Sequence, residues 1–269
     1  MNTLAWIIGF TLLGGVAGVL LASLFLLVPE RARARSLPMM VAFATGALLA
    51  AALLGLLPEA IERAGEGRHG AVGLSLLGGI ALFFVLEKLV LWRHCHEDHC
   101  ETHAPAPDHD HGHDHGRRVA PGVMILVGDT MHNALDGVLI AAAFLIDIHL
   151  GVMTGLAVLA HEVPSEVGNF AVLLNSGMTR KKAFAWNLIS ALGAVLGGLV
   201  GYFALSALEP ALPYVLAVSA ASLLYVAVAD LIPGLHRRVG PLDSVKQVAL
   251  IALGVGLVVA VEHLAPHAH

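Results

Sequence analysis

Residues 120–146 read APGVMILVGDTMHNALDGVLIAAAFLI, an apolar run with a polar string at its centre. A run of this length crosses the hydrocarbon core of a membrane, which needs about 20 apolar residues. It nevertheless contains Asp129, His132, Asn133 and Asp136. Ionisable side chains at membrane depth are costly and usually functional. Positions i, i+1 and i+4 of a helix lie on or beside one face. We therefore expect a membrane helix with one functional polar face.

The composition of the whole chain agrees with a membrane location. The chain has 269 residues, of which 57% are hydrophobic and 13% are charged, whereas soluble domains carry about 25% charged residues. We expect an all-α membrane protein, a single domain over 1–269 built as a bundle of eight transmembrane helices. The net charge of −5 gives no reason to expect a nucleic-acid partner. The apolar segments that predict the eight helices are 4–28, 37–58, 71–92, 120–146, 150–174, 183–208, 212–234 and 244–264.

The basic residues indicate how such a bundle lies in the membrane. Of the 15 Lys and Arg residues, all but Arg63 and Arg68 lie on or beside the odd-numbered connections. Cytoplasmic loops carry an excess of Lys and Arg. The pattern therefore predicts that both termini are outside and that the odd-numbered connections are cytosolic.

The third connection, residues 93–119, is rich in metal-binding side chains. Eight of the 16 histidines and both cysteines, Cys95 and Cys100, lie in it. Imidazole and thiolate bind zinc and neighbouring metals, and a segment of this composition cannot build a core. We expect a disordered cytosolic His-rich loop between helices three and four. It is either a metal buffer or sensor, or a solvated linker with incidental affinity for metals.

A second polar string follows in the next apolar segment. It contains His161, Glu162, Pro164, Ser165 and Glu166. Of these, His161, Glu162 and Ser165 stand at positions i, i+1 and i+4, the spacing of the polar residues in 132–136. Proline removes a backbone donor and is expected to kink the helix near the site. Ser165 is interpreted either as a ligand, directly or through water, or as a partner of the backbone. Two half-sites of imidazole and carboxylate groups predict a route for a divalent metal ion.

Several of these polar residues have a second interpretation. Asp129 has either an approach or exit role for the ion or a packing role. The polar group of the fourth segment could also be a hydrogen-bonded network that holds helices together. Asn187 and Ser190 in the sixth segment predict hydrogen bonds between helices. The candidate metal ligands are His132, Asn133, Asp136, His161, Glu162, Ser165, Asp129 and Glu166.

The two strings resemble the motifs of the Zrt-, Irt-like protein (ZIP) family of divalent metal transporters. The matching residues are His132-Asn133-x-x-Asp136-Gly137 and His161-Glu162-x-Pro164-x-Glu166-x-Gly168. The resemblance implies eight helices, outside termini, a His-rich cytosolic loop and a homodimer. It also implies import of Zn2+, and of Fe2+, Mn2+ or Cd2+, into the cytosol by alternating access.

The resemblance further implies a two-metal centre. His132 and Asp136 would hold the first metal, and Asn133, Asp136 and Glu162 would hold the second. The chain departs from the subgroup that it most resembles at Ser165, where histidine is usual. It also departs at Asn169, where aspartate is usual. The missing histidine puts full occupancy by two metals in doubt, unless His161 compensates.

We expect no enzymatic activity and no resident cofactor, since the metal is the substrate. A bacterial inner membrane is the expected location. One competing hypothesis is an intramembrane zinc metalloenzyme with the His-Glu-x-x-His signature, but Ser165 stands at its last position. A metal exporter and a metal sensor are two further hypotheses that the metal-binding side chains allow.

Overall fold

The computed structural model describes residues 2–94, 119–237 and 240–264, and this part of the chain is helical with no strand. Three π-helical stretches, Leu13–Ala17, Ala51–Leu56 and Val226–Leu231, continue α-helices without a break, and a short 3-10 turn, Glu209–Ala211, precedes α9. The prediction of an all-α protein is confirmed. The α-helices are α1 (Thr3–Leu12), α2 (Gly18–Phe25), α3 (Glu30–Ala50), α4 (Leu57–Ala64), α5 (His69–His94), α6 (Val119–Ile146), α7 (Ile148–Asn175), α8 (Arg180–Ser206), α9 (Leu212–Tyr225), α10 (Ile232–Leu235) and α11 (Pro241–Leu264).

Most of these helices are suited to a membrane. Within the described residues, seven helical stretches are long and apolar enough to cross one. The helix missing from this set is α7, because the polar string from His161 to Asn169 lowers its hydropathy. The seven stretches are Thr3–Phe25, Glu30–Ala64, His69–Leu89, Ile125–Ile146, Arg180–Ser206, Glu209–Leu235 and Pro241–His263.

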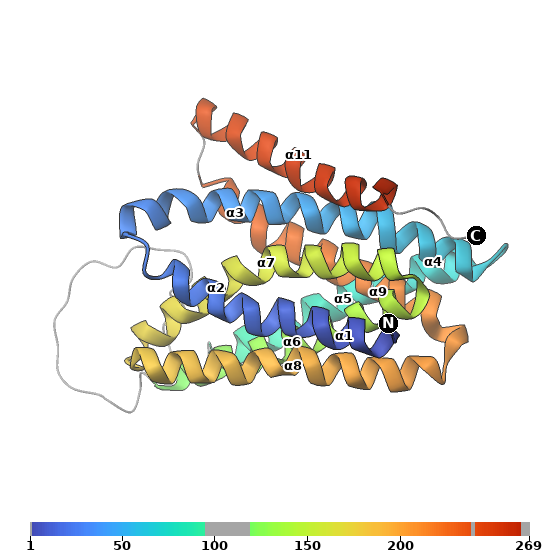
Figure 1. Cartoon of the computed structure of the whole chain (residues 1–269), viewed down its shortest axis with the longest axis horizontal. Helices are drawn as coiled ribbons and strands as arrows, with labels where there is room; N and C mark the ends of the chain where they lie inside the picture. Colours follow the sequence, from blue (N-terminus) through green and yellow to red (C-terminus); the bar gives the residue numbers. More distant parts are fainter. Residues whose placement is uncertain (1, 95–118, 238–239, 265–269) are drawn as a thin grey trace.

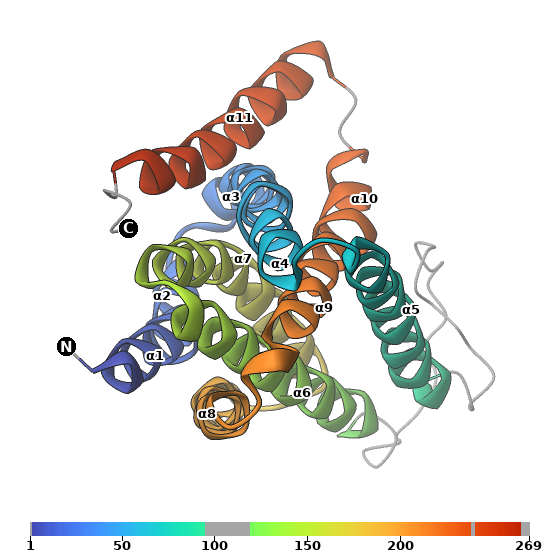
Figure 2. The same ribbon diagram turned by 90° about the vertical axis from the view of Figure 1, so that its right-hand side faces the viewer.

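The helices run roughly alongside one another, and α1 begins at the end of the bundle where α11 finishes (Figure 1). Seen along the bundle, α6, α7, α4 and α9 lie centrally, with α5 and α11 at the periphery (Figure 2). The helices α6 and α7 are joined only by Asp147, whose side chain caps α7 by accepting hydrogen bonds from the backbone N–H groups of His149 and Leu150. This tight turn places the two polar strings on neighbouring antiparallel helices.

Glycines bring α6 and α8 into backbone contact. A Cβ on Gly193 would lie 2.8 Å from the carbonyl oxygen of Thr130, and one on Gly197 would overlap the carbonyl of Ala134. On α6, a Cβ on Gly137 would overlap the backbone of Ala194. Small residues at such contacts let membrane helices pack closely without a hydrophobic driving force. The helix that carries the first polar string is therefore held at a fixed distance from α8.

The metal-ligating strings lie between two clusters of buried apolar side chains. One cluster contains the residues that follow Asp136 on α6 and precede His161 on α7, including Ile140, Phe144 and Met153. The other contains Leu126 and Phe170, at the opposite ends of the same two helices. Because the two helices are antiparallel, the polar strings meet at one level between these clusters.

Three local expectations are corrected or left open. The second helix does not begin at residue 37 but at Glu30, directly after the extended Pro29, because the segment ERARAR consists of good helix formers. The α7 helix continues through Pro164, and the π-helical stretches lie elsewhere, so the kink expected at Pro164 stays a prediction. Most of the His-rich loop 93–119, with Cys95 and Cys100, lies outside the described residues.

Candidate metal site

Four side chains from the two strings converge between α6 and α7. One ligand atom from each of His132, Asp136, His161 and Glu162 lies within 4.8 Å of all the others. The first two residues are one turn apart on α6, and the last two are adjacent on α7. Among the described residues no other group of His, Cys, Asp or Glu side chains meets this condition.

The nitrogen–nitrogen and nitrogen–oxygen distances within the group are close to those of a tetrahedral zinc site. The two imidazole Nε2 atoms are 3.2 Å apart. The Nε2 atom of His161 lies 3.3 Å from Asp136 Oδ2 and 3.5 Å from Glu162 Oε1. The Nε2 atom of His132 lies 3.7 and 3.6 Å from the same two oxygens. Zinc bound at about 2.0–2.1 Å by four such atoms would separate them by about 3.3–3.4 Å.

The group is buried and its negative charge lacks hydrogen-bond donors. Asp136 and Glu162 are each 1% exposed and His161 is 2% exposed, whereas the side chain of His132 is 25% exposed. None of the four carboxylate oxygens has a hydrogen-bond partner among the described residues. Buried charges are normally paired or bound to a metal. The arrangement is therefore suited to a cation shared by the two carboxylates, and His132 is its most accessible ligand.

A backbone contact orients one imidazole for metal binding. The Nδ1 atom of His161 lies 3.3 Å from the carbonyl oxygen of Ala157, one turn earlier on α7. A proton on Nδ1 donated to this carbonyl leaves the lone pair of Nε2 directed at the other three ligands. Contacts of this kind fix the tautomer and ring orientation of metal-binding histidines. His161 therefore points into the group, which sequence alone left undecided.

Asp129 lies in a separate hydrogen-bonded network. Its carboxylate accepts hydrogen bonds from the side-chain amide of Asn169, at 2.7 Å, and from the hydroxyl of Ser190, at 2.5 Å. The Ser190 hydroxyl also lies 3.0 Å from that of Thr130. This network joins α6, α7 and α8. Ser190 makes the contact between helices that was predicted, whereas both polar atoms of Asn187 lack a partner among the described residues.

The remaining predicted ligands lie outside the four-residue group. The side-chain amide of Asn133 donates a hydrogen bond to the backbone carbonyl of Asp129 at 3.0 Å. Ser165 is half-buried, one turn after His161. Glu166 is fully buried, its oxygens have no hydrogen-bond partner among the described residues, and acidic Asp129 and Glu162 act on it electrostatically. Such a carboxyl must be neutralised by a proton or a cation.

Sequence reasoning missed two supporting contacts. Neither the carbonyl of Ala157 nor the hydroxyl of Thr130 was singled out, because backbone carbonyls and membrane threonines are too common to be a signal. Thr130 donates to the carbonyl of Leu126 on its own helix, the usual arrangement for threonine in a helix. Only the fold shows that these ordinary groups face the site and its network.

A bundle of membrane-length helices with a buried group of potential metal ligands is the arrangement expected of a membrane transporter of metal ions. Residues 3–262 match the ZIP zinc transporter family. The mouse zinc transporter ZIP13 is 32% identical over 259 residues, which cover 85% of this chain and 71% of that protein. The rat zinc transporter SLC39A7 is 30% identical over 342 aligned residues, covering 97% of this chain and 72% of that protein. The chain belongs to the ZIP zinc transporter family.

Family membership confirms the predicted resemblance and the class of activity. The protein transports divalent metal ions and is a transporter rather than an enzyme. The hypotheses of a metalloenzyme, an exporter and a sensor are not favoured.

Proposed function

We propose that the protein carries Zn2+ into the cytosol through the group formed by His132, Asp136, His161 and Glu162. The observation that supports this most strongly is the set of distances between 3.2 and 3.7 Å among their ligand atoms. Zinc favours four nitrogen and oxygen ligands in a tetrahedron, whereas manganese and magnesium favour six oxygens. Fe2+ and Cd2+ are proposed as weaker substrates, and Mn2+ as the weakest.

In this proposal the charges of the ion and the site cancel. Asp136 and Glu162 together offset the charge of a dehydrated divalent ion, and the two imidazoles complete its coordination. Because imidazole binds metal only when unprotonated, protons compete with the ion. His132, the most exposed ligand, makes the first and last contact with the moving ion. His161 supplies the nitrogen that the subgroup's histidine would otherwise provide at Ser165.

The other candidate residues are proposed to support this group. Asp129 positions α6 through its bonds to Asn169 and Ser190. Glu166, whose buried oxygens have no hydrogen-bond partner among the described residues, offers a weaker second position for a cation, which Ser165 reaches only through water.

The two apolar clusters on either side of the site suit alternating access. One separates the ligands from the end where α6 meets α7, and the other from the end where α7 meets α8. Opening one cluster at a time would expose the ion to each side in turn. The movement is proposed to run downhill or with an ion gradient.

The topology and the setting are also proposals. Eight spans with both termini outside are supported by the distribution of Lys and Arg and by the eight apolar segments. A homodimer is supported by the family resemblance. The compact chain supports a bacterial inner membrane, a location that the mammalian relatives do not address. The loop 93–119 is proposed to buffer cytosolic metal.

The test is metal flux into proteoliposomes that contain the purified full chain, with Zn2+, Fe2+, Mn2+ and Cd2+ compared at equal concentrations. The proposal expects the highest ratio of kcat to KM for Zn2+. It also expects the flux to disappear in Asp136→Asn and to persist in Glu66→Gln, a change in an exposed connection. Flux of Mn2+ faster than of Zn2+, or normal flux in Asp136→Asn, would contradict it.

A further inference from the structure

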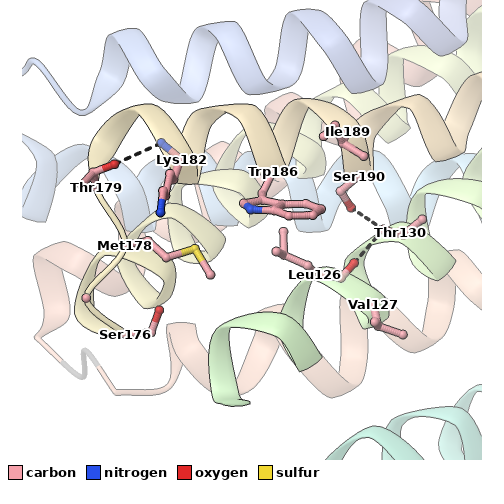
Figure 3. Close-up of a pocket in the computed structure, with 11 residues that line it drawn as sticks. Leu126, Val127, Thr130, Ser176, Met178, Thr179, Lys182, Trp186, Ile189 and Ser190 are labelled. Atoms are coloured by element: carbon pink, nitrogen blue, oxygen red, sulfur yellow. Dashed lines mark hydrogen bonds between the residues drawn. The ribbon is translucent and has the colours of Figure 1, made fainter. Parts of the chain in front are cut away.

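A groove separates the beginning of α6 from the beginning of α8. Its volume is about 500 Å³, within the range of about 300–1,000 Å³ typical of ligand sites. Trp186 points from α8 toward Leu126 of α6 across this space, and Met178 of the α7–α8 turn lies at one end (Figure 3). We call this space the α6–α8 groove. It is distinct from the metal ligands, none of which lines it.

The groove is polar at one end and apolar along the rest. Ser176, Thr179 and Lys182 gather at the α7–α8 turn, whereas Val127 and Ile189 line the portion deeper in the span (Figure 3). Those last two side chains are 52% and 55% exposed and belong to membrane-length helices, so their exposed surface faces hydrocarbon. A lateral opening of this kind in a bilayer admits an acyl chain but not a hydrated solute.

The charge at the polar end favours an anionic headgroup. Arg180, Lys181 and Lys182 are consecutive and exposed, and they form no ion pair with any other described residue. They also begin α8, whose helix dipole attracts anions, although the backbone N–H of Lys182 already donates to the hydroxyl of Thr179. Basic pockets between transmembrane helices on the cytoplasmic side bind the headgroups of anionic lipids. Only Lys182 of the three lines the groove itself.

The floor of the groove connects it to the metal site. Thr130 and Ser190 line it, and their hydroxyls form the pair that meets Asp129. Asp129 lies one turn before His132 on α6. An acyl chain in the groove would pack against this hydroxyl pair and exclude competing water from it. Occupancy would thereby stabilise the position of α6 relative to α8.

We propose that the α6–α8 groove binds one anionic phospholipid, with the headgroup phosphate at Lys182 and an acyl chain along Trp186 and Ile189, and that this lipid supports metal transport. The headgroup makes the binding selective for anionic lipid, and the chain makes it specific to the groove. The bound lipid would affect the metal site through Ser190, which lines the groove, and Asp129, to which Ser190 donates a hydrogen bond. The binding half of the proposal is independent of which metal is carried.

Binding is tested by native mass spectrometry of the full chain in detergent, with phosphatidylglycerol and phosphatidylcholine of identical acyl chains. The wild-type protein is expected to retain one phosphatidylglycerol molecule more strongly than phosphatidylcholine. The retention of phosphatidylglycerol should fall about fivefold in Lys182→Gln. The matched control Lys181→Gln, outside the groove, should lose clearly less. Val127→Trp should fill the apolar end and reduce retention without changing charge. Equal retention of the two lipids, equal losses in the two lysine variants, or full retention in Val127→Trp would overturn the proposal.

Support of transport is tested by zinc flux in liposomes of phosphatidylcholine alone and of phosphatidylcholine with phosphatidylglycerol. Wild-type flux should be faster with the anionic lipid, and Lys182→Gln should lose that difference while keeping its flux in phosphatidylcholine. A wild-type flux that is the same in both membranes would overturn this half. Failure of the proposed zinc route would instead appear as no flux in either membrane, with lipid retention intact.

Discussion

Two aspartates on α6, two turns apart, have opposite surroundings. Asp129 and Asp136 are 8% and 1% exposed, yet each oxygen of Asp129 accepts a hydrogen bond from a neutral side chain. The oxygens of Asp136 accept none among the described residues and face two imidazole nitrogens and Glu162. Burial alone therefore does not identify a metal ligand. A buried carboxylate without donors must be neutralised by a proton or a cation, and the facing imidazoles make Asp136 suited to a metal ion, whereas a carboxylate with its donors satisfied can hold helices together.

This difference separates the polar residues of the two strings by function. Those whose ligand atoms face one another, His132, Asp136, His161 and Glu162, form the proposed transport site. Those bonded to helix backbones or neutral side chains, Asn133 and Asp129, set its geometry. We therefore expect changes at Asp136, at Asp129 and at Ser165 to have progressively smaller effects on zinc binding and flux.

The largest effect is expected for Asp136→Asn. The amide keeps the volume but removes a negative charge and a strong ligand, so zinc flux into proteoliposomes should fall to background. The rise in Tm on adding zinc to the detergent-solubilised protein should disappear as well. Tm without metal should not fall, because the variant buries one unpaired charge fewer. A large loss of metal-free stability would show that Asp136 is structural, and so equivalent to Asp129.

Acidification should have the next largest effect. Two imidazoles, those of His132 and His161, must be unprotonated to hold the ion. Zinc affinity should therefore fall as the pH decreases, by up to about 100-fold per pH unit where both imidazoles bind protons in competition with the ion. Isothermal titration of zinc between pH 5.5 and 8 measures this slope. Because the loop histidines are also expected to bind zinc, the reference is Asp136→Asn titrated in parallel. The same dependence of affinity on pH in that variant would show that the pH effect arises outside the site.

A smaller effect is expected for Asp129→Asn. The amide can accept from Ser190 and, after the Asn169 amide turns over, can donate to it, but both bonds lose the negative charge of the acceptor and become weaker neutral bonds. Loss of a contact that supports metal ligands typically costs about 10–100-fold in affinity or activity, and we expect about tenfold in zinc flux with binding stoichiometry kept.

The double variant Asp129→Asn with Asn169→Asp provides the control. Exchanging the carboxylate and the amide restores the stronger, charge-assisted bond between α6 and α7, so flux should recover toward the wild-type value. Loss of zinc stoichiometry in Asp129→Asn, or no recovery in the double variant, would mean that Asp129 binds the ion directly.

The smallest effect is expected for Ser165→Ala. If Ser165 reaches the ion only through water, zinc affinity and flux should change by no more than about threefold, the scale of a weak neutral hydrogen bond. Radiometric zinc uptake at several concentrations measures both values. A change comparable to that of Asp136→Asn would make Ser165 a direct ligand.

Sequence reasoning reached most of the site because its signals are local. Helical spacing placed His132 with Asp136, and His161 beside Glu162, and the apolar surroundings made their charge costly. The tight α6–α7 turn, read from the short connection, then placed both strings on neighbouring helices. The all-α membrane class followed from composition in the same way.

What could not be read from sequence depends on packing between distant segments. Asp129 differs from the metal ligands because Ser190 of α8 donates a hydrogen bond to it. Ser190 comes close to α6 because Gly193 and Gly197 allow backbone contact between the two helices. The inward direction of His161 depends on the carbonyl of Ala157. The helical continuity of α7 through Pro164 reflects tertiary packing that overrides a local preference.

The most direct test of the central claim is the location of bound zinc in crystals of the full chain, from anomalous diffraction at the zinc edge. The account predicts one dominant peak about 2.0–2.1 Å from the Nε2 atoms of His132 and His161 and from single oxygens of Asp136 and Glu162. That peak should be absent in Asp136→Asn crystals soaked in the same way. A dominant peak at Asp129, or one whose ligands exclude His161, would contradict the account.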